Sequence, residues 1–533
     1  MRFTLYVLRF TYHALRLRRQ PTLKSDAVNS NFALPLVLTL DIGTSSLRAM
    51  LFDAHAHAVD GVYSKIEYEM HTTPDGGVQD DADVMFERAC QALDELVARV
   101  GGQAAQIAAV ASDQLVSNVL GVDAAGHAVT PFFTYADTRS ARQVDQLRAQ
   151  VDEETAHQRV GTLFHTSYLP ARVLWLAGTD PGLFQRVRWW MSLGEYFYFC
   201  WLGQRACSYS TASWTGLLNR RTLEWDRELI AVLPISLEQL SPLVDVYAPL
   251  RGLKAEYAAR WPSLQNANWY PTAGDGATAN IGSGCTDATR VALTVGTSSA
   301  IRVTVPTQSL AENTSEMRLI PKGLWAYRVD RRHELYGGAL SEGGNLYEWM
   351  RETLKLTGDA ADIESALAAM PPDGHGLTVL PFLAGERAPG WVADARATIL
   401  GLSLNTRPID ILRAGLEGVA YRLALIFELL HPVAPDAVQV IASGGALMHS
   451  PTWVQIIADV IGVPVIASAE PEATSRGAAL LALKALGVTN SLKDIAPELG
   501  AVYRPDEVRH AVYSASVKRQ QKWYNLLVSR MTG

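Results

Sequence analysis

Short apolar runs alternate with longer helical patterns along most of the chain. Residues 36–40 and 48–52 are runs of strand-forming residues separated by a turn of small residues, which predicts a β-hairpin. Residues 83–100 and 409–429 place apolar side chains at intervals of three and four, which predicts amphipathic helices. Because strands alternate with such helices, we predict an α/β architecture.

The strand–turn–strand pattern occurs twice. The first turn, Asp41-Ile42-Gly43-Thr44-Ser45-Ser46, and the second, Gly296-Thr297-Ser298-Ser299, share the tetrapeptide GTSS, and each lies between two apolar runs. One copy in each half predicts two domains of similar design, with both turns facing a common cleft. We expect a basic, poorly ordered extension at residues 1–35, one domain at 36–285, a second at 286–515, and a C-terminal helix or tail at 516–533.

Composition supports this division and argues against several classes of function. A chain of 533 residues is too long for one hydrophobic core, and 48% hydrophobic with 19% charged residues is the balance of a globular protein. The net charge of −7 argues against general nucleic-acid binding, which relies on many cations. No apolar run reaches the roughly 20 residues of a membrane span. The four cysteines contain no CxxC pair, so we expect neither a disulfide framework nor a zinc site.

The first 35 residues differ from the rest in charge. They contain six basic residues against one acid, Asp26. A basic segment poor in acids is typical of a transit peptide, and the simpler interpretation is a non-conserved tail or a start codon assigned too early. Because no signal-peptide core or cleavage pattern is visible, we favour the simpler interpretation. We expect a cytoplasmic protein, with organellar targeting left open.

The two turns carry residues suited to binding phosphate. Glycine allows close backbone approach, while hydroxyl and N–H groups donate to phosphate oxygens, so two turns would hold a polyphosphate from both sides. Asp41 then lies where a carboxylate binds Mg²⁺ through water. Arg48 would reach a terminal phosphate, and a solvated arginine at a strand end is an equal alternative. The predicted phosphate-binding residues are Gly43, Thr44, Ser45, Arg48, Gly296, Thr297 and Ser298.

Two more glycine-rich segments follow apolar runs. Asp275 lies between Gly274 and Gly276, on a turn that would expose its carboxylate as a general base for an alcohol requires. A structural Asx-turn is the alternative for this segment. Residues 438–442 lead into Gly444, Gly445 and Ala446, and a strand followed by glycines suits a flat ligand such as an adenine ring.

Taken together, these motifs resemble, in their order, those of the FGGY carbohydrate kinases, over about residues 36–486. The resemblance implies two actin-like, ribonuclease-H-like ATPase domains flanking a cleft, with ATP and Mg²⁺ as cofactors. It implies that Asp275 takes a proton from a substrate hydroxyl, which then attacks the γ-phosphoryl group of ATP. Asp41 and Asp275 would hold Mg²⁺ through water, and Gly344 would join the ATP site. The implied sugar contacts are Ser117, Tyr135, Asp137, Arg139, Asp275 and Gly276.

The segment at residues 381–389 (PFLAGERAP) resembles the gluconate-kinase branch of this family. A carboxylated substrate would meet a cation, and Arg139 or Arg387 would supply it, with a structural ion pair as the alternative for each. The strand expected to contact the sugar departs from that branch, because Val116 and Ser117 stand where Met-His is usual. The resemblance at residues 381–389 makes gluconate the leading substrate. The departure at Val116 and Ser117 keeps xylulose, ribulose or another polyol as the alternative.

A remote alternative is a non-catalytic actin-like ATPase, because this fold also serves proteins that bind ATP and change shape. The two phosphate turns and Asp275 favour a kinase over that alternative. We expect a small sugar or sugar acid as the partner, and neither nucleic acid nor a membrane. A homodimer is left open.

Overall fold

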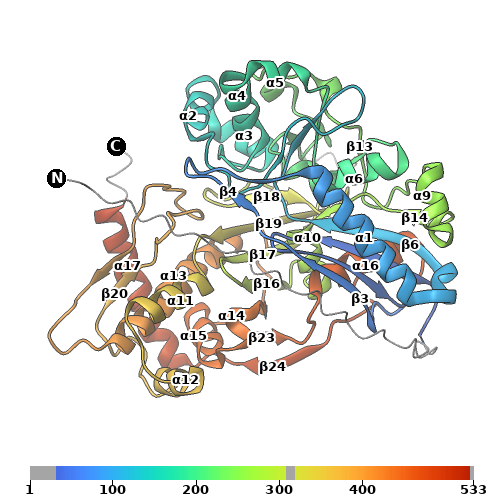
Figure 1. Cartoon of the computed structure of the whole chain (residues 1–533). Helices are drawn as coiled ribbons and strands as arrows, with labels where there is room; N and C mark the ends of the chain where they lie inside the picture. The colour runs from blue at the N-terminus through green and yellow to red at the C-terminus, as the bar shows by residue number, and fades with distance from the viewer. Residues whose placement is uncertain (1–31, 308–317, 529–533) are drawn as a thin grey trace, which may run out of the picture.

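Two mixed β-sheets with helices on their faces form the molecule, and the computed structural model describes residues 32–307 and 318–528 (Figure 1). The expectation of a poorly ordered extension falls almost entirely on residues 1–31, which lie outside the described residues. No helix in the described ranges is long and apolar enough to cross a membrane.

The first sheet contains the predicted N-terminal hairpin. Its strands are, in spatial order, β14 (Asn268–Trp269), β6 (Ile107–Gln114), β1 (Leu36–Ile42), β2 (Ser46–Phe52) and β3 (Ala58–Glu67), and β15 (Ala273–Gly274) also pairs with β6. β1 is antiparallel to β2, which confirms the hairpin, and parallel to β6. Every residue of β1 is buried because helices cover both faces of the sheet, which explains its nearly continuous apolar sequence.

The second sheet repeats this design. Its strands are, in spatial order, β18 (Trp325–Arg328), β19 (His333–Leu340), β17 (Ser299–Pro306), β16 (Arg290–Val295), β22 (Gln439–Ser443), β23 (Val465–Ser468) and β24 (Leu499–Tyr503). β16 is antiparallel to β17 and parallel to β22, so its two neighbours match those of β1. The repeated GTSS pattern therefore predicted a real structural repeat.

Alternate residues of β1 face opposite sides of the first sheet. Leu36, Leu38 and Leu40 pack with α1 (Ala82–Val100), which confirms the helix predicted at residues 83–100. Val37 packs on the other face with α16 (Ala473–Ala485). The odd-numbered residues of β1, Asp41 included, therefore face the second domain.

Two helices lie between the sheets and connect the domains (Figure 1). They are α10 (Asp275–Gly282) and α16, and they cross where glycines allow their backbones to touch. A Cβ atom on Gly477 would lie 1.9 Å from the carbonyl oxygen of Thr278, and one on Gly282 would lie 1.7 Å from that of Ala473. This close crossing, at Thr278 and Gly282, fixes the middle and end of α10 against α16 at the interface of the domains.

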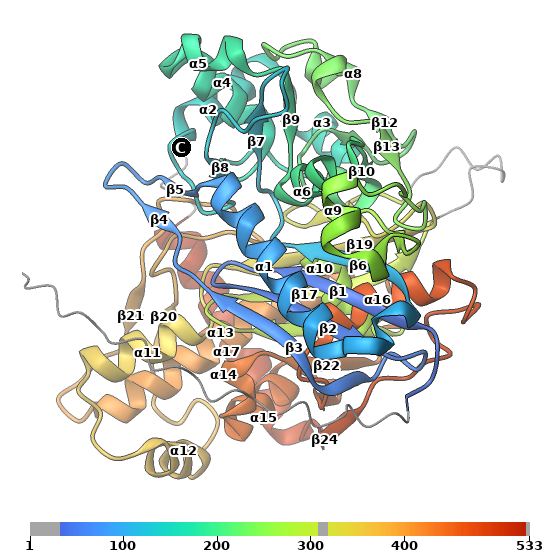
Figure 2. The same ribbon diagram turned by 45° about the vertical axis from the view of Figure 1, so that its right-hand side comes forward.

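The C-terminal helix α17 (Glu507–Leu527) packs on helices and a strand of the second domain (Figure 2). Its neighbours are α13 (Pro408–Leu430), which confirms the helix predicted at residues 409–429, α15 (Pro451–Ile461) and β20 (Thr378–Leu380). The border expected at residue 516 falls within α17. Residues 507–527 are one continuous helix.

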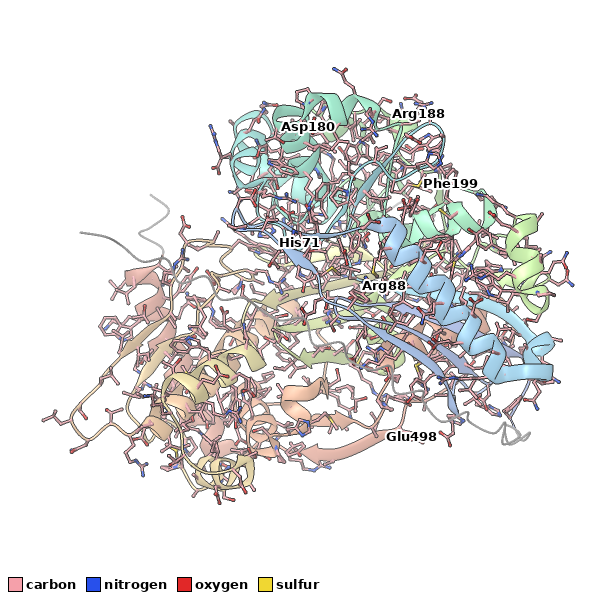
Figure 3. The ribbon with its side chains drawn as sticks, viewed as in Figure 1. His71, Arg88, Asp180, Arg188, Phe199 and Glu498 are labelled. Atoms are coloured by element: carbon pink, nitrogen blue, oxygen red, sulfur yellow. The ribbon has the colours of Figure 1, made fainter. Side chains whose placement is uncertain are left out.

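The remaining elements of the first domain include a helical lobe at the top of Figure 1, small sheets beside it, and helices that pack against α1 and β14 lower in the view. Asp180 and Arg188 lie in this lobe, far from Glu498 beside β24 (Figure 3). The helices are α2 (Ala141–Gln150), α3 (Glu153–Val160), α4 (Leu169–Thr179), α5 (Pro181–Arg186), α6 (Leu193–Leu202), α7 (Tyr209–Ser213), α8 (Arg227–Ile230) and α9 (Ala255–Arg260). The short strands are β4 (His71–Thr72), β5 (Val78–Asp80), β7 (Leu120–Val122), β8 (Phe132–Phe133), β9 (Trp189–Met191), β10 (Cys207–Ser208), β11 (Leu218–Asn219), β12 (Glu224–Trp225) and β13 (Leu243–Val244). The second domain adds α11 (Gly344–Thr353), α12 (Ala360–Ala368), α14 (Gly445–Met448) and β21 (Thr398–Leu400).

Candidate active site

The first predicted phosphate turn joins β1 to β2. The Gly43 N–H donates to the Ser46 carbonyl oxygen at 3.0 Å, which closes the turn. Thr44 and Ser45 at its tip are exposed. Their hydroxyl and N–H groups therefore face the space outside the sheet, as binding to phosphate oxygens requires.

The second turn joins β16 to β17 and is tied to the start of α11. The Gly296 N–H donates to Ser298 at 2.9 Å, and the Gly344 N–H donates to the Gly296 carbonyl at 2.7 Å. The Asn345 N–H donates to Thr297 at 3.1 Å. The turn and the N-terminal end of α11 therefore form one unit.

Gly444 brings a third predicted segment to the same place. It has φ of 98°, and a Cβ atom there would lie 2.4 Å from the Val295 carbonyl oxygen, so glycine is required. Gly445 and Ala446 begin α14 directly after it, and the Ala446 side chain lies beside Gly344. The structure thus brings together the three segments predicted to bind ATP in the second domain.

Asp275 begins α10 and lines a cavity of about 190 Å³ between the domains. Burial raises the pKa of its carboxyl to about 7, against the opposing effect of the nearby Arg302 guanidinium. A carboxylate with that pKa is matched to accept a proton near neutral pH. The predicted residues Ser117, Tyr135, Gly276 and Ser298 also line this cavity.

Two guanidinium groups line the cavity together with Asp275. One belongs to Arg387, a predicted candidate, and the other to Arg302, which the sequence did not single out. Arg302 lies on β17 and donates to the Gly276 carbonyl at 3.2 Å. The sequence could have indicated Arg302 by its position, four residues after Ser298 on the strand that follows the second phosphate turn.

Asp137 and Arg139 are not among the residues that line this cavity. The Arg139 Nε donates to Asp137 Oδ1 at 3.1 Å, and its guanidinium lies 4.6 Å from the Trp175 ring centre. The two side chains form an ion pair with each other, which is the structural alternative that the sequence analysis considered for Arg139. Their contact with a sugar stays a prediction.

Arg48 pairs with acids from both domains. Its Nη2 lies 3.3 Å from Asp41 Oδ2, and its Nη1 donates to Glu472 at the start of α16. This ion pair links β2 to the second domain. Binding of a terminal phosphate by Arg48 stays a prediction.

Asp113 is a buried acid at this site that the sequence interpretation missed. It is the penultimate residue of β6 and pairs in register with Asp41 of β1. Burial and the neighbouring Asp41 carboxylate raise the pKa of its carboxyl well above the usual value. The signal available in the sequence was an aspartate at the end of the apolar run at residues 107–111.

Comparison with known proteins covers most of the chain. Models of the N-terminal and C-terminal domains of the FGGY family of carbohydrate kinases match residues 36–282 and 291–486. A gluconokinase of Bacillus licheniformis is 27% identical over 504 residues, which is 92% of this chain and 95% of that protein. A glycerol kinase of Herminiimonas arsenicoxydans is 29% identical over 503 residues, 91% of this chain and 99% of that protein.

Solved structures agree with these matches. Gluconate kinase from Lactobacillus acidophilus superimposes with a TM-score of 0.84 at 26% identity, covering 92% of this chain and 98% of that one. Ligand-bound xylulose kinase from the same organism gives 0.84 at 27% identity, covering 93% and 98%. The expected fold of two actin-like, ribonuclease-H-like ATPase domains is confirmed. The chain belongs to the FGGY family of carbohydrate kinases.

Proposed function

We propose that the protein transfers the γ-phosphoryl group of ATP to a hydroxyl of a small sugar acid, with gluconate as the leading substrate and 6-phosphogluconate as the product. The observation that carries this proposal is the charge of the cavity. Arg302 and Arg387 line it beside one acid, Asp275, among the described residues. A carboxylate pairs well with guanidinium groups, whereas a neutral sugar requires no such excess of cations. The likeness to gluconate kinases supports the same substrate.

Asp275 is the proposed general base. It accepts the proton of a substrate hydroxyl, and the freed oxygen attacks the γ-phosphorus of ATP while the bond to the ADP oxygen breaks. The raised pKa of about 7 supports this role, because the carboxylate is basic enough to bind the proton and is largely ionised above neutral pH. The rest of the catalysis is positioning and neutralisation of charge.

The two turns would hold the phosphates of ATP from opposite sides. The first turn offers the exposed tip at Thr44 and Ser45, and the second offers Thr297 and Ser298. The remaining ATP contacts are assigned to Gly43, Gly296, Gly344, Gly444, Gly445 and Ala446.

The same region suits a divalent cation. Asp41 and Asp275 would hold Mg²⁺, and the buried, unpartnered carboxylate oxygens of Asp113 beside them fit a site built for a cation. Bound Mg²⁺ supplies neutralisation of charge on the phosphates.

A pentulose or another polyol is the second candidate substrate. Val116 and Ser117 line the cavity where the gluconate-kinase branch usually has Met-His. The Ser117 hydroxyl donates to the Trp214 carbonyl at 3.0 Å, so the wall differs from an imidazole in both shape and hydrogen bonding. The likeness to xylulose kinase favours the same alternative.

Release of ADP from Mg·ATP distinguishes these substrates. The purified protein is assayed with gluconate, xylulose, ribulose, erythritol and glycerol, together with a blank without sugar. Turnover that depends on gluconate supports the sugar-acid proposal. Turnover on a neutral sugar alone contradicts it and favours the second candidate.

The remote alternative, an ATPase without sugar kinase activity, has its own signature. It predicts ADP release that is equal with and without sugar and that survives Asp275→Asn. A kinase with Asp275 as its base instead loses sugar-dependent turnover in that variant.

A further inference from the structure

His165 belongs to the wall of the sugar cavity, although the sequence did not single it out. It lies in the loop between α3 and α4 and lines the cavity together with Asp275 and Arg387. Its ring centre lies 5.6 Å from that of Trp391, in the second domain, and 6.4 Å from that of Tyr168, in the first. Aromatic contacts from both domains therefore hold the imidazole in the wall of the cavity.

The hydrogen bonds of the His165 ring decide which of its nitrogens carries the hydrogen. The Ser167 N–H donates to His165 Nδ1 at 3.2 Å, and Nδ1 is an acceptor because a backbone hydrogen cannot rotate away. The Ser167 hydroxyl lies 2.9 Å from Nδ1 and 2.8 Å from the Tyr135 carbonyl oxygen, and it can rotate to donate to either. In the neutral imidazole the hydrogen is therefore on Nε2.

The His165 imidazole is an uncharged donor near neutral pH. Burial lowers its pKa to about 4, and so do the neighbouring guanidinium groups of Arg387, Arg172 and Arg148. Its Nε2 has no hydrogen-bond partner within residues 32–307 and 318–528, yet it is not one of the buried unpaired polar atoms of those residues. The Nε2–H group therefore reaches the open space of the cavity that His165 lines.

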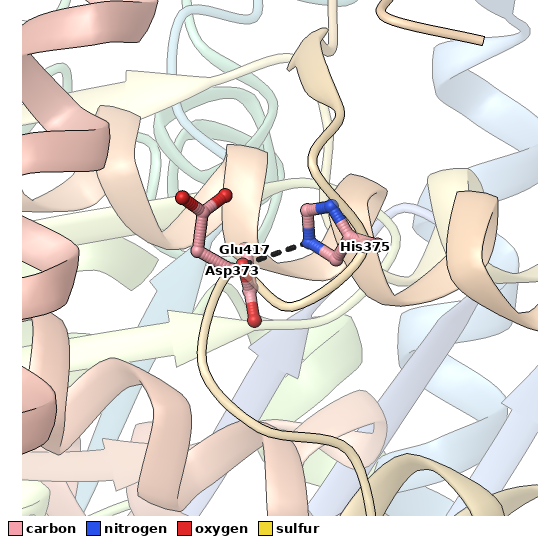
Figure 4. A group of neighbouring side chains, drawn as sticks. All are labelled: Asp373, His375 and Glu417. Atoms are coloured by element: carbon pink, nitrogen blue, oxygen red, sulfur yellow. Dashed lines mark hydrogen bonds and ion pairs between the residues drawn. The ribbon is translucent and has the colours of Figure 1, made fainter. Parts of the chain in front are cut away.

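His375 has the same arrangement, but its second nitrogen is occupied. The Leu377 N–H donates to His375 Nδ1 at 2.9 Å, again from the residue two positions later. Its Nε2 lies 3.0 Å from Glu417 Oε2, and Asp373 completes a group whose ligand atoms lie within 4.8 Å of one another (Figure 4). Both ring nitrogens are in use, so this group has no imidazole lone pair left for a metal. The Nε2 of His375 serves the fold, whereas that of His165 is left for a ligand.

The loop of His165 lies next to Ser117, which stands where the gluconate-kinase branch usually has histidine. The buried Arg172 joins the two segments, because its Nη1 donates to the Ser117 carbonyl at 2.6 Å and its Nε donates to the Thr166 carbonyl at 3.1 Å. Ser117 and His165 line the same cavity from these neighbouring segments. An imidazole is therefore present beside the position from which it is missing.

We propose that the Nε2–H of His165 donates to a substrate oxygen beside Arg387, and so supplies from another loop the imidazole that is absent at Ser117. In a sugar acid that oxygen belongs to the carboxylate, which would accept from His165 and Arg387 together. The inference rests on the proposed sugar site. It adds a substrate-binding residue from the first domain to the arginine from the second.

The test uses two variants of the full-length protein that keep different parts of the imidazole. The amide oxygen of His165→Asn can replace Nδ1 and accept the Ser167 N–H, but the variant has no donor at the position of Nε2. The longer His165→Gln can place an N–H group there. In steady-state kinetics with saturating Mg·ATP, the KM for gluconate should rise by about tenfold to a hundredfold in His165→Asn and by less in His165→Gln. The KM for ATP should not change, and an unchanged KM for gluconate in His165→Asn overturns the proposal.

His375→Asn is the matched control, because it makes the same change in a network outside the cavity. It should lower the melting temperature and leave the KM for gluconate unchanged, and a rise in KM equal to that of His165→Asn overturns the proposal. His165→Phe keeps a ring against Trp391 without an N–H group, and it gives the same test if His165→Asn does not fold.

A double variant tests whether His165 and Arg387 meet the same substrate group. The rise in KM of His165→Asn combined with Arg387→Gln should be smaller than the product of the two single effects. A rise equal to that product overturns the shared contact.

The proposed function and this inference fail separately. Turnover on a neutral sugar alone contradicts the sugar-acid proposal, and the same variants are then measured with that sugar. A raised KM for it in His165→Asn still supports the contact of His165 with substrate, and an unchanged KM overturns it. If no sugar supports turnover by the wild type, both proposals are wrong.

Discussion

Arg387 lines the cavity and is the side chain that we expect to meet a charged substrate. Its Nη2 donates to the Leu340 carbonyl at 3.1 Å, while its buried Nε has no hydrogen-bond partner within residues 32–307 and 318–528. A buried N–H without an acceptor costs free energy. The guanidinium lines the cavity, so the carboxylate of a bound sugar acid would pair with it, and a neutral sugar would supply a weaker acceptor.

Arg387→Gln should therefore raise the KM for gluconate by about tenfold to a hundredfold, the value of a hydrogen bond to a charged group. Steady-state kinetics with saturating Mg·ATP measures this change. Arg396→Gln, at an exposed arginine nearby, is the matched control and should leave KM unchanged. An unchanged KM in Arg387→Gln would remove this arginine from the substrate site.

Glu342 couples stability to pH at the second phosphate turn. It is 2% exposed, and its Oε1 accepts from the Ala384 N–H at 3.0 Å. Burial raises the pKa of its carboxyl to about 7 from 4.5, so the folded protein prefers the protonated form. The wild type therefore loses stability as pH rises from 4.5 to above 7.

Glu342→Gln mimics the protonated form and keeps the acceptor oxygen. The free energy of unfolding of the variant minus that of the wild type should increase by up to about 3 kcal/mol from pH 5 to pH 8. Denaturant unfolding at the two pH values measures this difference. If this difference in free energy of unfolding stays constant or decreases as pH rises, Glu342 is ionised in the folded protein at both pH values.

The sequence alone identified most of the residues that meet at the site, and the reason lies in local patterns. Gly296 and Gly444 were predictable because turns and glycines leave a local signature. Asp113 was not, because it reaches the site through pairing with Asp41 on a strand far away in the chain. Arg302 was not, because its place depends on a tertiary contact with the Gly276 carbonyl rather than on its local hairpin. Asp137 and Arg139 were selected by their motif, but their partners are each other.

At the scale of elements, α17 holds the segment that carries Arg387. Glu386, the residue before it, accepts from the Tyr524 hydroxyl at 2.6 Å and pairs with Arg422 of α13. The C-terminal helix is therefore part of the support for the cavity wall. We therefore expect a change in α17 to affect substrate binding through Glu386 and Arg387.

Tyr524→Phe should destabilise the protein by about 1–2 kcal/mol, because it leaves a buried carboxylate short of a donor. It should also raise the KM for the sugar while leaving the KM for ATP unchanged. Kinetics with each substrate varied in turn separates the two effects, with the exposed Lys522→Ala as the control on the same helix. A loss of stability without a change in either KM would limit α17 to a structural role.

The elements themselves were largely predictable from periodicity. The hairpin at residues 36–52 and the helices at 83–100 and 409–429 are present because apolar spacing records which face is buried. The domain border expected at residue 516 stays a prediction, and it falls inside α17, which runs from Glu507 to Leu527. The sequence there is polar and its apolar residues are widely spaced, so the helix is stabilised by packing on α15, β20 and α13 rather than marked by a clear apolar period.

At the scale of the whole molecule, the crossing of α10 and α16 connects the two domains. α16 belongs to the second half of the chain, yet it packs against β1 and β6 of the first sheet. Gly477 lies at the crossing, and a Cβ atom there would overlap the Thr278 carbonyl oxygen at 1.9 Å. The helices can approach this closely only because the side chain is absent.

Gly477→Ala should lower the free energy of unfolding by about 1–3 kcal/mol, because the backbones must separate. Gly178→Ala in α4 is the matched control, since its Cβ would meet no atom within 4 Å. Alanine is a better helix former than glycine, so Gly178→Ala should raise the free energy of unfolding by about 0.5–1 kcal/mol. Calorimetric melting that gave both changes the same sign would contradict the packing described at the crossing.

The most direct test of the whole account is formation of 6-phosphogluconate from gluconate and Mg·ATP, measured together with ADP release, in the wild type and in Asp275→Asn. We predict equal amounts of the two products in the wild type. We predict a loss of about 10²–10⁴-fold in turnover in the variant, the usual contribution of a general base. Phosphorylation of gluconate at an undiminished rate by Asp275→Asn, or ADP release by the wild type without any phosphorylated gluconate, would contradict the account.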